Sequence, residues 1–492
     1  MAEGPARLDP GTRKELLQVL DFGRVDAESE TDLDRRFVRT SDFERFIRPD
    51  IQLVLGAKGT GKSAIFDLFA RFEQTARSQA GREIEDVIVA TGTGLGDLHE
   101  VATGDLEELR PDNDYGRLWR LYIAVKAAFA VADLARGTNG AVAQVLKAAG
   151  EIPDRRIGPL LGRLWRAVVS AEAPGEIGVA GVSIGDFDHG TLDVTQILND
   201  ANGLLERRGR RAWILFDKVD ELHPGRPAER KRALEGLVAE AMSVRRTFPR
   251  IEPRIFLRTD IWKDLDFTNK THLVDRQVEL SWSPLQLARI LVKGAMTHAD
   301  VAAYVTARVP EARTGADTLN DDSLLPALTT LLPDKAYPGE READILDWIY
   351  ARVTDARGTA FPRETILLGN RARQRQLTLG ETGDVSSSLI GREAIRDAFS
   401  EVSTLRCDTY LAEFPWLREH FARFAGRTQA EFTRDEVTAM MEGLEPTGTE
   451  MLTALYDVGL LRPVGGHVST ADVFEVPRLY RQGLGLVIRG RA

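Results

Sequence analysis

The segment Gly56-Ala57-Lys58-Gly59-Thr60-Gly61-Lys62-Ser63 decides the fold of this chain. It follows the pattern G-x-x-x-x-G-K-S, the Walker A motif or phosphate-binding loop (P-loop). Residues 51–55 before it form a short apolar run that indicates a buried strand, and residues 64–69 after it continue with helical spacing. A strand, a glycine-rich turn and a helix N-terminus together favour phosphate binding, because glycines allow close approach and unpaired N–H groups attract an anion.

This loop predicts a site for ATP and Mg²⁺. We expect Lys62 to reach the β- and γ-phosphates and the hydroxyl of Ser63 to ligate Mg²⁺. The residues expected to contact the nucleotide are Gly56, Ala57, Lys58, Gly59, Thr60, Gly61, Lys62, Ser63 and Ala64.

A second motif follows 155 residues after Lys62. The apolar run 212–216 ends in Asp217, as in a Walker B strand, whose carboxylate holds Mg²⁺ beside the P-loop. Asp220 and Glu221 come directly after it, and either one could orient and deprotonate the attacking water. The long gap between the two motifs predicts an insertion in the core, at about residues 97–190.

Further apolar runs predict the other strands of a parallel sheet, at residues 86–90, 254–260 and 277–282. Arg258 lies near the end of its run, where a guanidinium could sense the γ-phosphate. The spacing also predicts a long helix over 115–134. Residues 310–340 carry four prolines and two glycines and are interpreted mostly as loop.

Composition limits the classes of protein. The 492 residues carry 65 basic and 75 acidic side chains, a net charge of −10, which disfavours bulk nucleic-acid binding. Cys407 is the single cysteine, which excludes an intrachain disulfide and suits a reducing cytosol, so we expect a cytoplasmic protein. The longest apolar helical stretch contains three charged residues and predicts a core helix rather than a membrane span.

The sequence predicts an α/β protein in four parts. Residues 1–48 form a helical segment whose phenylalanines are expected to pack on the next part, although one of these rings could instead line a nucleotide-base pocket. Residues 49–283 form the P-loop ATPase core, residues 284–380 a helical lid, and residues 381–492 a helical linker and a winged helix. The winged helix is predicted from helices at 433–443 and 449–459, with a capping box from Thr433 to Glu436, and from a hairpin at 462–476.

With these motifs in hand, the chain resembles the STAND class of P-loop ATPases. It is most similar to bacterial stand-alone P-loop ATPases near that class and near the origin-recognition, AAA+-like ATPases. The segments that carry this resemblance are residues 55–64, Phe216-Asp217-Lys218-Val219-Asp220-Glu221, Phe256-Leu257-Arg258-Thr259-Asp260, Leu280-Ser281-Trp282-Ser283 and the early Asp21-Phe22-Gly23.

The resemblance implies a parallel-sheet ATPase core, a helical lid and a winged helix. It implies that Asp217 holds Mg²⁺, that Asp220 or Glu221 positions water, that Arg258 senses the γ-phosphate, and that Pro362 and Arg363 bring the lid to the nucleotide. Two features depart from the pattern. Lys218 stands where such ATPases carry a small residue or a catalytic glutamate, and the lid signature Gly358-x-x-x-Pro362 is looser than usual.

Three functions compete. The first is a slow ATPase that acts as a switch with a separate effector protein, as the resemblance implies for bacterial defence against phage. The second is a DNA-binding initiator that uses the winged helix; against it, residues 431–492 carry nine acids, six arginines and no lysine, and the second helix has no cation. The third is a scaffold that holds nucleotide without hydrolysis.

Arginines outside the motifs give two further predictions. Arg245, Arg246 and Arg250 could complete the site of a neighbouring copy in a homo-oligomer. The clusters 207–211 and 371–375 are candidates for nucleic-acid contact, although they equally suit helix ends exposed to solvent.

Overall fold

The computed structural model describes residues 8–93, 114–150, 160–162, 164, 193–223, 225–381 and 387–486. The chain divides into two compact units. Unit 1 contains the residues up to 40, the loop residues 57–61 and the residues from 281 onward, and unit 2 contains residues 41–56 and 62–280. Most of the predicted insertion at 97–190 lies outside the described residues.

Unit 2 is built on a five-stranded sheet of order β2-β3-β4-β1-β5, in which every strand pair is parallel. The strands are β1 (Leu53–Gly56), β2 (Val87–Thr93), β3 (Arg211–Asp217), β4 (Ile251–Arg258) and β5 (Gln277–Glu279). All five predicted strands are therefore confirmed, with ends that differ by a few residues. Because β1 lies between β4 and β5, the P-loop leaves the sheet next to its middle strand.

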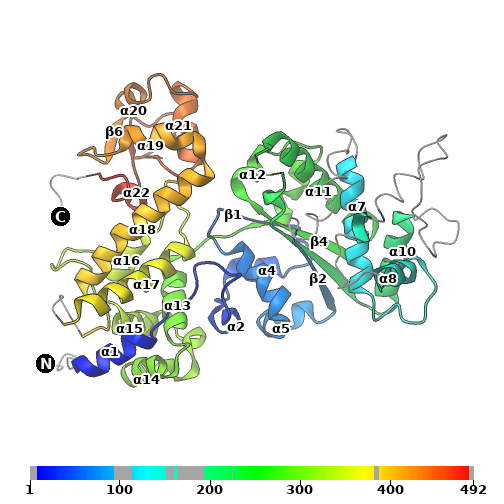
Figure 1. Ribbon diagram of the computed structural model, residues 1–492, viewed down its shortest axis with the longest axis horizontal. Helices are drawn as coiled ribbons and strands as arrows, with labels where there is room; N and C mark the ends of the chain where they lie inside the picture. Colours follow the sequence, from blue (N-terminus) through cyan, green and yellow to red (C-terminus); the bar gives the residue numbers. More distant parts are fainter. Residues whose placement is uncertain are drawn as a thin grey trace. The chain divides into compact units, whose positions relative to one another are not determined.

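Helices cover both faces of this sheet (Figure 1). They are α3 (Ser41–Phe46), α4 (Lys62–Arg71), α5 (Glu73–Ala80), α7 (Asp114–Ala130), α8 (Ala141–Gly150), α10 (Val194–Arg207), α11 (Pro227–Thr247) and α12 (Thr259–Asp264), with 3₁₀ turns at Gly81–Ile84, Val219–Glu221 and Lys270–Arg276. Trp213 faces Phe46 and Phe69, whereas Phe216 of the same strand faces Trp119 and Tyr122 of α7. The alternation along β3 thus buries both faces, as a parallel sheet requires.

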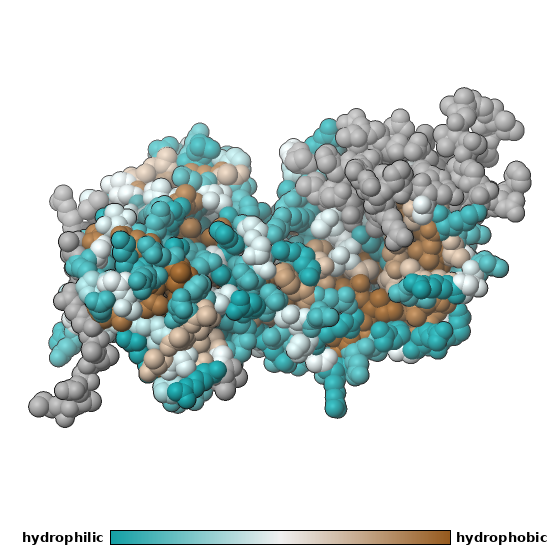
Figure 2. Space-filling model, turned by 60° about the horizontal axis from the view of Figure 1, so that its bottom comes forward, coloured by the Kyte–Doolittle hydropathy of each residue, from teal (hydrophilic) through white to brown (hydrophobic). Residues whose placement is uncertain are grey.

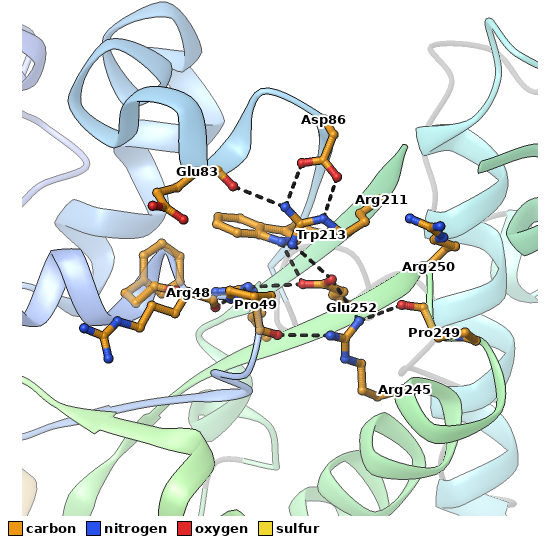
Figure 3. A network of polar contacts seen from close by, with 12 residues as sticks. Arg48, Pro49, Glu83, Asp86, Arg211, Trp213, Arg245, Pro249, Arg250 and Glu252 are labelled. Atoms are coloured by element: carbon orange, nitrogen blue, oxygen red, sulfur yellow. Dashed lines mark hydrogen bonds and ion pairs between the residues drawn. The ribbon is translucent and has the colours of Figure 1, made fainter. Parts of the chain in front are cut away.

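The amino ends of β3 and β4 meet at a buried charge network (Figure 3). Glu252 is 2% exposed, and it accepts a hydrogen bond from the indole of Trp213 at 2.9 Å. Guanidinium groups of three arginines contact the same carboxylate, Arg245 at 2.8 Å, Arg254 at 3.1 Å and Arg211 at 3.4 Å. Burial lowers the pKa of Arg254 to about 10, and Glu252 acts in the opposite direction, so this carboxylate favours the charged form of the arginine.

The same arginines tie the segment before β1 to the sheet. Arg254 donates to the carbonyls of Phe46 and, at 2.8 Å, Arg48, and it stacks 3.6 Å above the ring of Trp213. Arg245 donates to the carbonyl of Pro49 at 3.0 Å. The network therefore sets where the chain enters the strand that precedes the P-loop.

Unit 1 is mostly helical. Its helices are α1 (Pro10–Val19), α2 (Leu33–Arg36), α13 (Pro284–Ala295), α14 (Ala299–Arg308), α15 (Asp321–Leu331), α16 (Ile345–Tyr350), α17 (Pro362–Leu379), α18 (Arg392–Glu413), α19 (Arg418–Phe424), α20 (Arg434–Met440), α21 (Gly448–Asp457) and α22 (Arg478–Arg481), with 3₁₀ turns at Pro310–Thr314, Ala316–Thr318 and Pro415–Leu417. A small antiparallel sheet joins β6 (Glu431–Thr433), β8 (Val473–Glu475) and β7 (Arg462–Pro463), in this order.

The N-terminal phenylalanines are buried, but only some of them pack on the part that follows in the sequence. Phe22 is 1% exposed and lies against two glycines, Gly294 of α13 and Gly369 of α17. A Cβ atom at Gly294 would come within 2.4 Å of the carbonyl oxygen of Phe22, so only glycine allows this approach. Phe43 and Phe46 pack in unit 2, on Phe69. The alternative that one of these rings lines a base pocket receives no support from these positions.

The interpretation of residues 310–340 as loop is wrong in its middle. These residues contain the helix α15, with Pro326 inside it. The side chain of Asn320 caps its first turn, and Leu324, Leu328 and Leu331 are buried on one face. Burial of this apolar face outweighs the hydrogen bond that proline cannot donate.

Unit 1 also contains a carboxylate whose pKa predicts a pH-dependent stability. Burial raises the pKa of Asp355 from 3.8 to about 6, although the amides of Arg357 and Thr359 each donate to it at 2.9 Å. The folded chain therefore holds this proton at pH values where the unfolded chain has released it, so stability falls as the pH rises from about 4 to about 7. We expect Asp355→Asn to remove about 2–3 kcal/mol of this fall.

Urea unfolding at pH 4 and pH 8 measures the effect. Asp347, an exposed carboxylate of α16, gives the matched control in Asp347→Asn, which should keep the wild-type difference between the two pH values. An unchanged pH dependence in Asp355→Asn would contradict the prediction.

Large apolar side chains are also present at the surface, among polar ones (Figure 2). The most exposed in the described part are Val274, Leu325, Leu405, Trp416 and Val464. None of the described helices combines the length and the apolar composition that crossing a membrane needs.

Candidate nucleotide-binding site

The functional residues predicted for unit 2 lie at one edge of its sheet. Gly56 ends β1 and pairs in register with Arg258, which ends β4. Asp217 ends β3. Because the strands are parallel, their carboxyl ends meet at this edge, where ligands bind in open α/β sheets.

Lys62 opens α4 and turns back toward the strand it follows. Its Nζ donates to the carbonyl oxygen of Gly56 at 2.8 Å. Burial lowers the pKa of the Lys62 ammonium, while the carboxylates of Asp220 and Asp217 act in the opposite direction. The ammonium therefore lies among carboxylates at the same edge, in surroundings where an added phosphate charge would interact strongly with it.

The geometry at Asp217 fits a divalent cation. Its carboxylate is 4% exposed and accepts a hydrogen bond from the hydroxyl of Ser63. Within the described residues, Oδ2 of Asp217 has no hydrogen-bond partner. Burial raises the pKa of this carboxyl, against the effect of Ser63. A buried carboxylate oxygen that lacks a donor, next to a serine hydroxyl, is the oxygen set that Mg²⁺ prefers.

Asp220 and Glu221 differ in their surroundings. Both lie in the 3₁₀ turn Val219–Glu221 after β3. Asp220 is partly buried and acts electrostatically on Lys62 and Asp217, whereas Glu221 is exposed. Lys218 between the strand and this turn has φ 57°, a left-handed conformation that is strained for a residue other than glycine.

Arg258 already has a partner on its own chain. Its Nε and Nη2 donate to both carboxylate oxygens of Asp260, at 3.0 and 2.8 Å. A bidentate pair of this kind fixes the plane of the guanidinium. To sense the γ-phosphate, Arg258 would have to bind Asp260 and the phosphate together, or give up Asp260 for the phosphate.

The middle of the P-loop, residues 57–61, belongs to unit 1 and contacts other residues of that unit. The indole of Trp282 donates to the carbonyl of Thr60 at 2.8 Å, and its ring lies 3.6 Å from where a Cβ of Gly61 would stand. Thr60 in turn donates its hydroxyl to the carbonyl of Ala57 at 2.8 Å. Gly59 and Gly61 have φ of 90° and 96°, so the turn needs glycine at both positions.

The first residues of this loop segment, Ala57 and Lys58, contact the end of α18 and the apolar cluster beside it. Nζ of Lys58 lies 2.9 Å from Oε1 of Glu413, the last residue of α18, and Ala57 packs against the apolar cluster around Phe361 and Cys407. Lys58 was predicted among the residues that contact the nucleotide. Its ammonium is engaged by a carboxylate, as expected for a side chain that points away from the phosphates, and the contact of this loop residue with the nucleotide stays a prediction.

Pro362 and Arg363 begin α17, next to Gly59. A Cβ at Gly59 would lie 3.4 Å from Cβ and Cδ of Arg363, and 3.6 Å from Oε2 of Glu364. Glu364 is buried, and its Oε1 accepts from Nη1 of Arg406 at 2.9 Å. Its Oε2 has no hydrogen-bond partner in the described part of the chain. The lid residues thus face the turn of the P-loop, and Ala64 lies in the first turn of α4.

The arginines predicted outside the motifs have different surroundings. Arg245 is held by Glu252 and two carbonyls of its own chain, which would have to be given up for it to reach a neighbouring copy. For all three arginines, 245, 246 and 250, the contact to a neighbouring copy stays a prediction. Arg371 and Arg375 pair with carboxylates of α18, and Arg373 donates to a carbonyl of α1. These three join helices from within α17, which differs from the alternative of solvent-exposed helix ends.

Sequence reasoning missed four residues at the site, Asp260, Glu364, Glu413 and the role of Trp282. Asp260 had a detectable signal, since it follows the sensor candidate by two residues at a strand end. The others come from segments more than 200 residues beyond the P-loop. Trp282 lies in a segment that carries the resemblance, but nothing in the local sequence marks Glu364 or Glu413.

No family model matches this sequence. One curated relative is described as a transposon gamma-delta 80.3 kDa protein of Escherichia coli (strain K12). It is 25% identical over 291 residues, which are 55% of this chain. The match spans 39% of that relative's length.

Among solved structures, the Walker-type ATPase PABY2304 of Pyrococcus abyssi is similar over 95% of this chain and 99% of its own, with 11% identity and a TM-score of 0.39. The Aeropyrum pernix ORC1 protein, solved in complex with DNA, is similar over 90% of this chain and 91% of its own, with 14% identity and a TM-score of 0.31. At these low scores, the fold assignment depends on the sheet and loop described above.

Proposed function

We propose that this chain binds ATP with Mg²⁺ at its P-loop, hydrolyses it slowly, and works as a nucleotide-controlled switch for a separate effector protein. One observation carries the proposal: Lys62 and Ser63, which end a complete Walker A sequence, meet the unpartnered oxygen of Asp217 at the carboxyl edge of a parallel sheet.

In this proposal, Lys62 neutralises charge on the β- and γ-phosphates, and Ser63 and Asp217 would hold Mg²⁺, which would supply further positive charge against the phosphates. The oxygen of the attacking water forms a bond to the γ-phosphorus, and Asp220 accepts a proton from this water. The bond from that phosphorus to the bridging oxygen breaks, and ADP and inorganic phosphate leave. Arg258 exchanges part of its pairing with Asp260 for the γ-phosphate.

The elements from β6 to β8 support the proposed winged helix. Two helices, α20 and α21, followed by the paired strands β7 and β8 support it, and a capping box joins Thr433 and Glu436; strand β6 was not part of the prediction. We further propose self-association, and action in defence against phage, on the resemblance to STAND-like bacterial ATPases. Contacts of residues 57–61 with α17 and α18 would let nucleotide in the loop act on the C-terminal part of unit 1.

The test is single-turnover hydrolysis by Asp220→Asn and Glu221→Gln. We expect Asp220→Asn to slow hydrolysis by about 10²-fold or more, because it removes the base that faces Lys62, while ATP still binds. Glu221→Gln should stay near the wild-type rate, because that carboxylate is exposed.

Titration calorimetry on both variants confirms that ATP still binds. A rate loss in Glu221→Gln alone would assign the base to Glu221. ATP binding without hydrolysis by the wild-type chain would instead favour the non-hydrolysing scaffold.

A further inference from the structure

Helices α20 and α21 enclose a cavity of about 340 Å³ that no part of the proposed nucleotide chemistry uses. Its inner wall is formed by the buried side chains of Val437, Met441, Met451 and Leu452. Exposed residues, among them Ala439 and Glu442, surround its opening. Methionine side chains adapt to differently shaped apolar groups, so this wall suits a protein side chain.

The surroundings of the cavity carry charge of one sign. Residues 435–461 contain six acidic residues and no lysine, arginine or histidine. Glu442, Glu445 and Glu450 are exposed, and the described residues offer no ion-pair partner to these three. The one arginine of this helix pair, Arg434, donates to the carbonyls of Val468 and Ala471.

This negative charge argues against nucleic-acid binding by the helix pair. Contact with a nucleic-acid backbone requires cations, and the carboxylates around the cavity would repel phosphate. The same carboxylates attract a cationic partner. An apolar side chain on that partner can be buried in the cavity, away from water.

We propose that α20 and α21 form a docking surface for a cationic segment of a partner protein, which inserts one apolar side chain into the cavity. None of the residues involved belongs to the P-loop. Failure of the proposed ATPase activity would therefore leave this inference untouched, and the reverse also holds.

The probe is a short amphipathic peptide of lysine and leucine, fluorescently labelled and titrated with the full chain. A lysine–serine peptide of equal charge and a glutamate–leucine peptide serve as controls. We expect the lysine–leucine peptide to bind about tenfold more tightly than either control, and to weaken as salt rises.

Two pairs of variants place the binding. Ala439→Trp fills the opening of the cavity and should weaken the lysine–leucine peptide by about tenfold, whereas Thr453→Trp, exposed on α21 outside the cavity, should not. The double variant Glu442→Gln/Glu450→Gln should weaken binding and its salt dependence, whereas Glu340→Gln/Glu419→Gln, two exposed acids elsewhere, should not.

Circular dichroism melting shows that each variant is folded. Equal binding by wild type and by both the Ala439→Trp and the double glutamine variant would overturn the proposal. So would equal binding of the glutamate–leucine peptide, or binding of duplex DNA that is lost in Ala439→Trp.

Discussion

Replacing Lys62 by alanine is expected to weaken ATP binding by about a hundredfold or more while the chain stays folded. The ammonium lies at the sheet edge among Asp217 and Asp220, where burial lowers its pKa. Removal of a charge-assisted contact to phosphate in such surroundings costs about 3 kcal/mol, which corresponds to a hundredfold in affinity. Titration calorimetry with Mg²⁺ and a non-hydrolysable ATP analogue measures the loss.

The matched control is Lys58→Ala, in the same loop. Lys58 is paired with Glu413, so its loss should change the affinity for ATP by no more than about threefold. Wild-type affinity in Lys62→Ala would remove the P-loop assignment, and a large loss in Lys58→Ala would show that its pairing with Glu413 breaks when ATP binds.

The largest expected effect on stability is that of Glu252→Gln. The substitution keeps the shape of the side chain but leaves Arg254 fully buried without its compensating charge. Removal of one partner from a buried ion pair costs about 3–5 kcal/mol, because the remaining charge stays desolvated. Three arginines share this carboxylate, so no other group of the network can replace it.

Urea unfolding at pH 7 tests this, with the loss sought in the transition that unfolds unit 2. Asp86→Asn is the matched control from the edge of the same network. Asp86 pairs with Arg211 at 2.7 Å but is 38% exposed in its side chain, so its loss should cost about 1 kcal/mol or less. Equal losses in the two variants would mean that burial does not set the strength of this network.

The sequence alone was sufficient for the α/β fold of unit 2 and for the centre of its candidate site. A strand, a complete Walker A loop and a helix start are adjacent in the chain, so local geometry places Lys62 and Ser63 together. Asp217 and Arg258 could be added because each ends an apolar run, and parallel strands bring their carboxyl ends to one edge. Thr433 and Glu436 predicted the start of α20, because a capping box is formed by residues only three positions apart.

Only the tertiary structure decided what surrounds these residues. The partners of the loop, Trp282, Glu364 and Glu413, come from segments far along the chain whose own sequence pattern serves their packing. The buried network at Glu252 likewise joins the ends of separate strands and helices, and its arginines cannot be told from surface arginines by spacing. Periodicity and motifs record contacts between chain neighbours, whereas the pairing of buried charges depends on which distant segments the fold brings together.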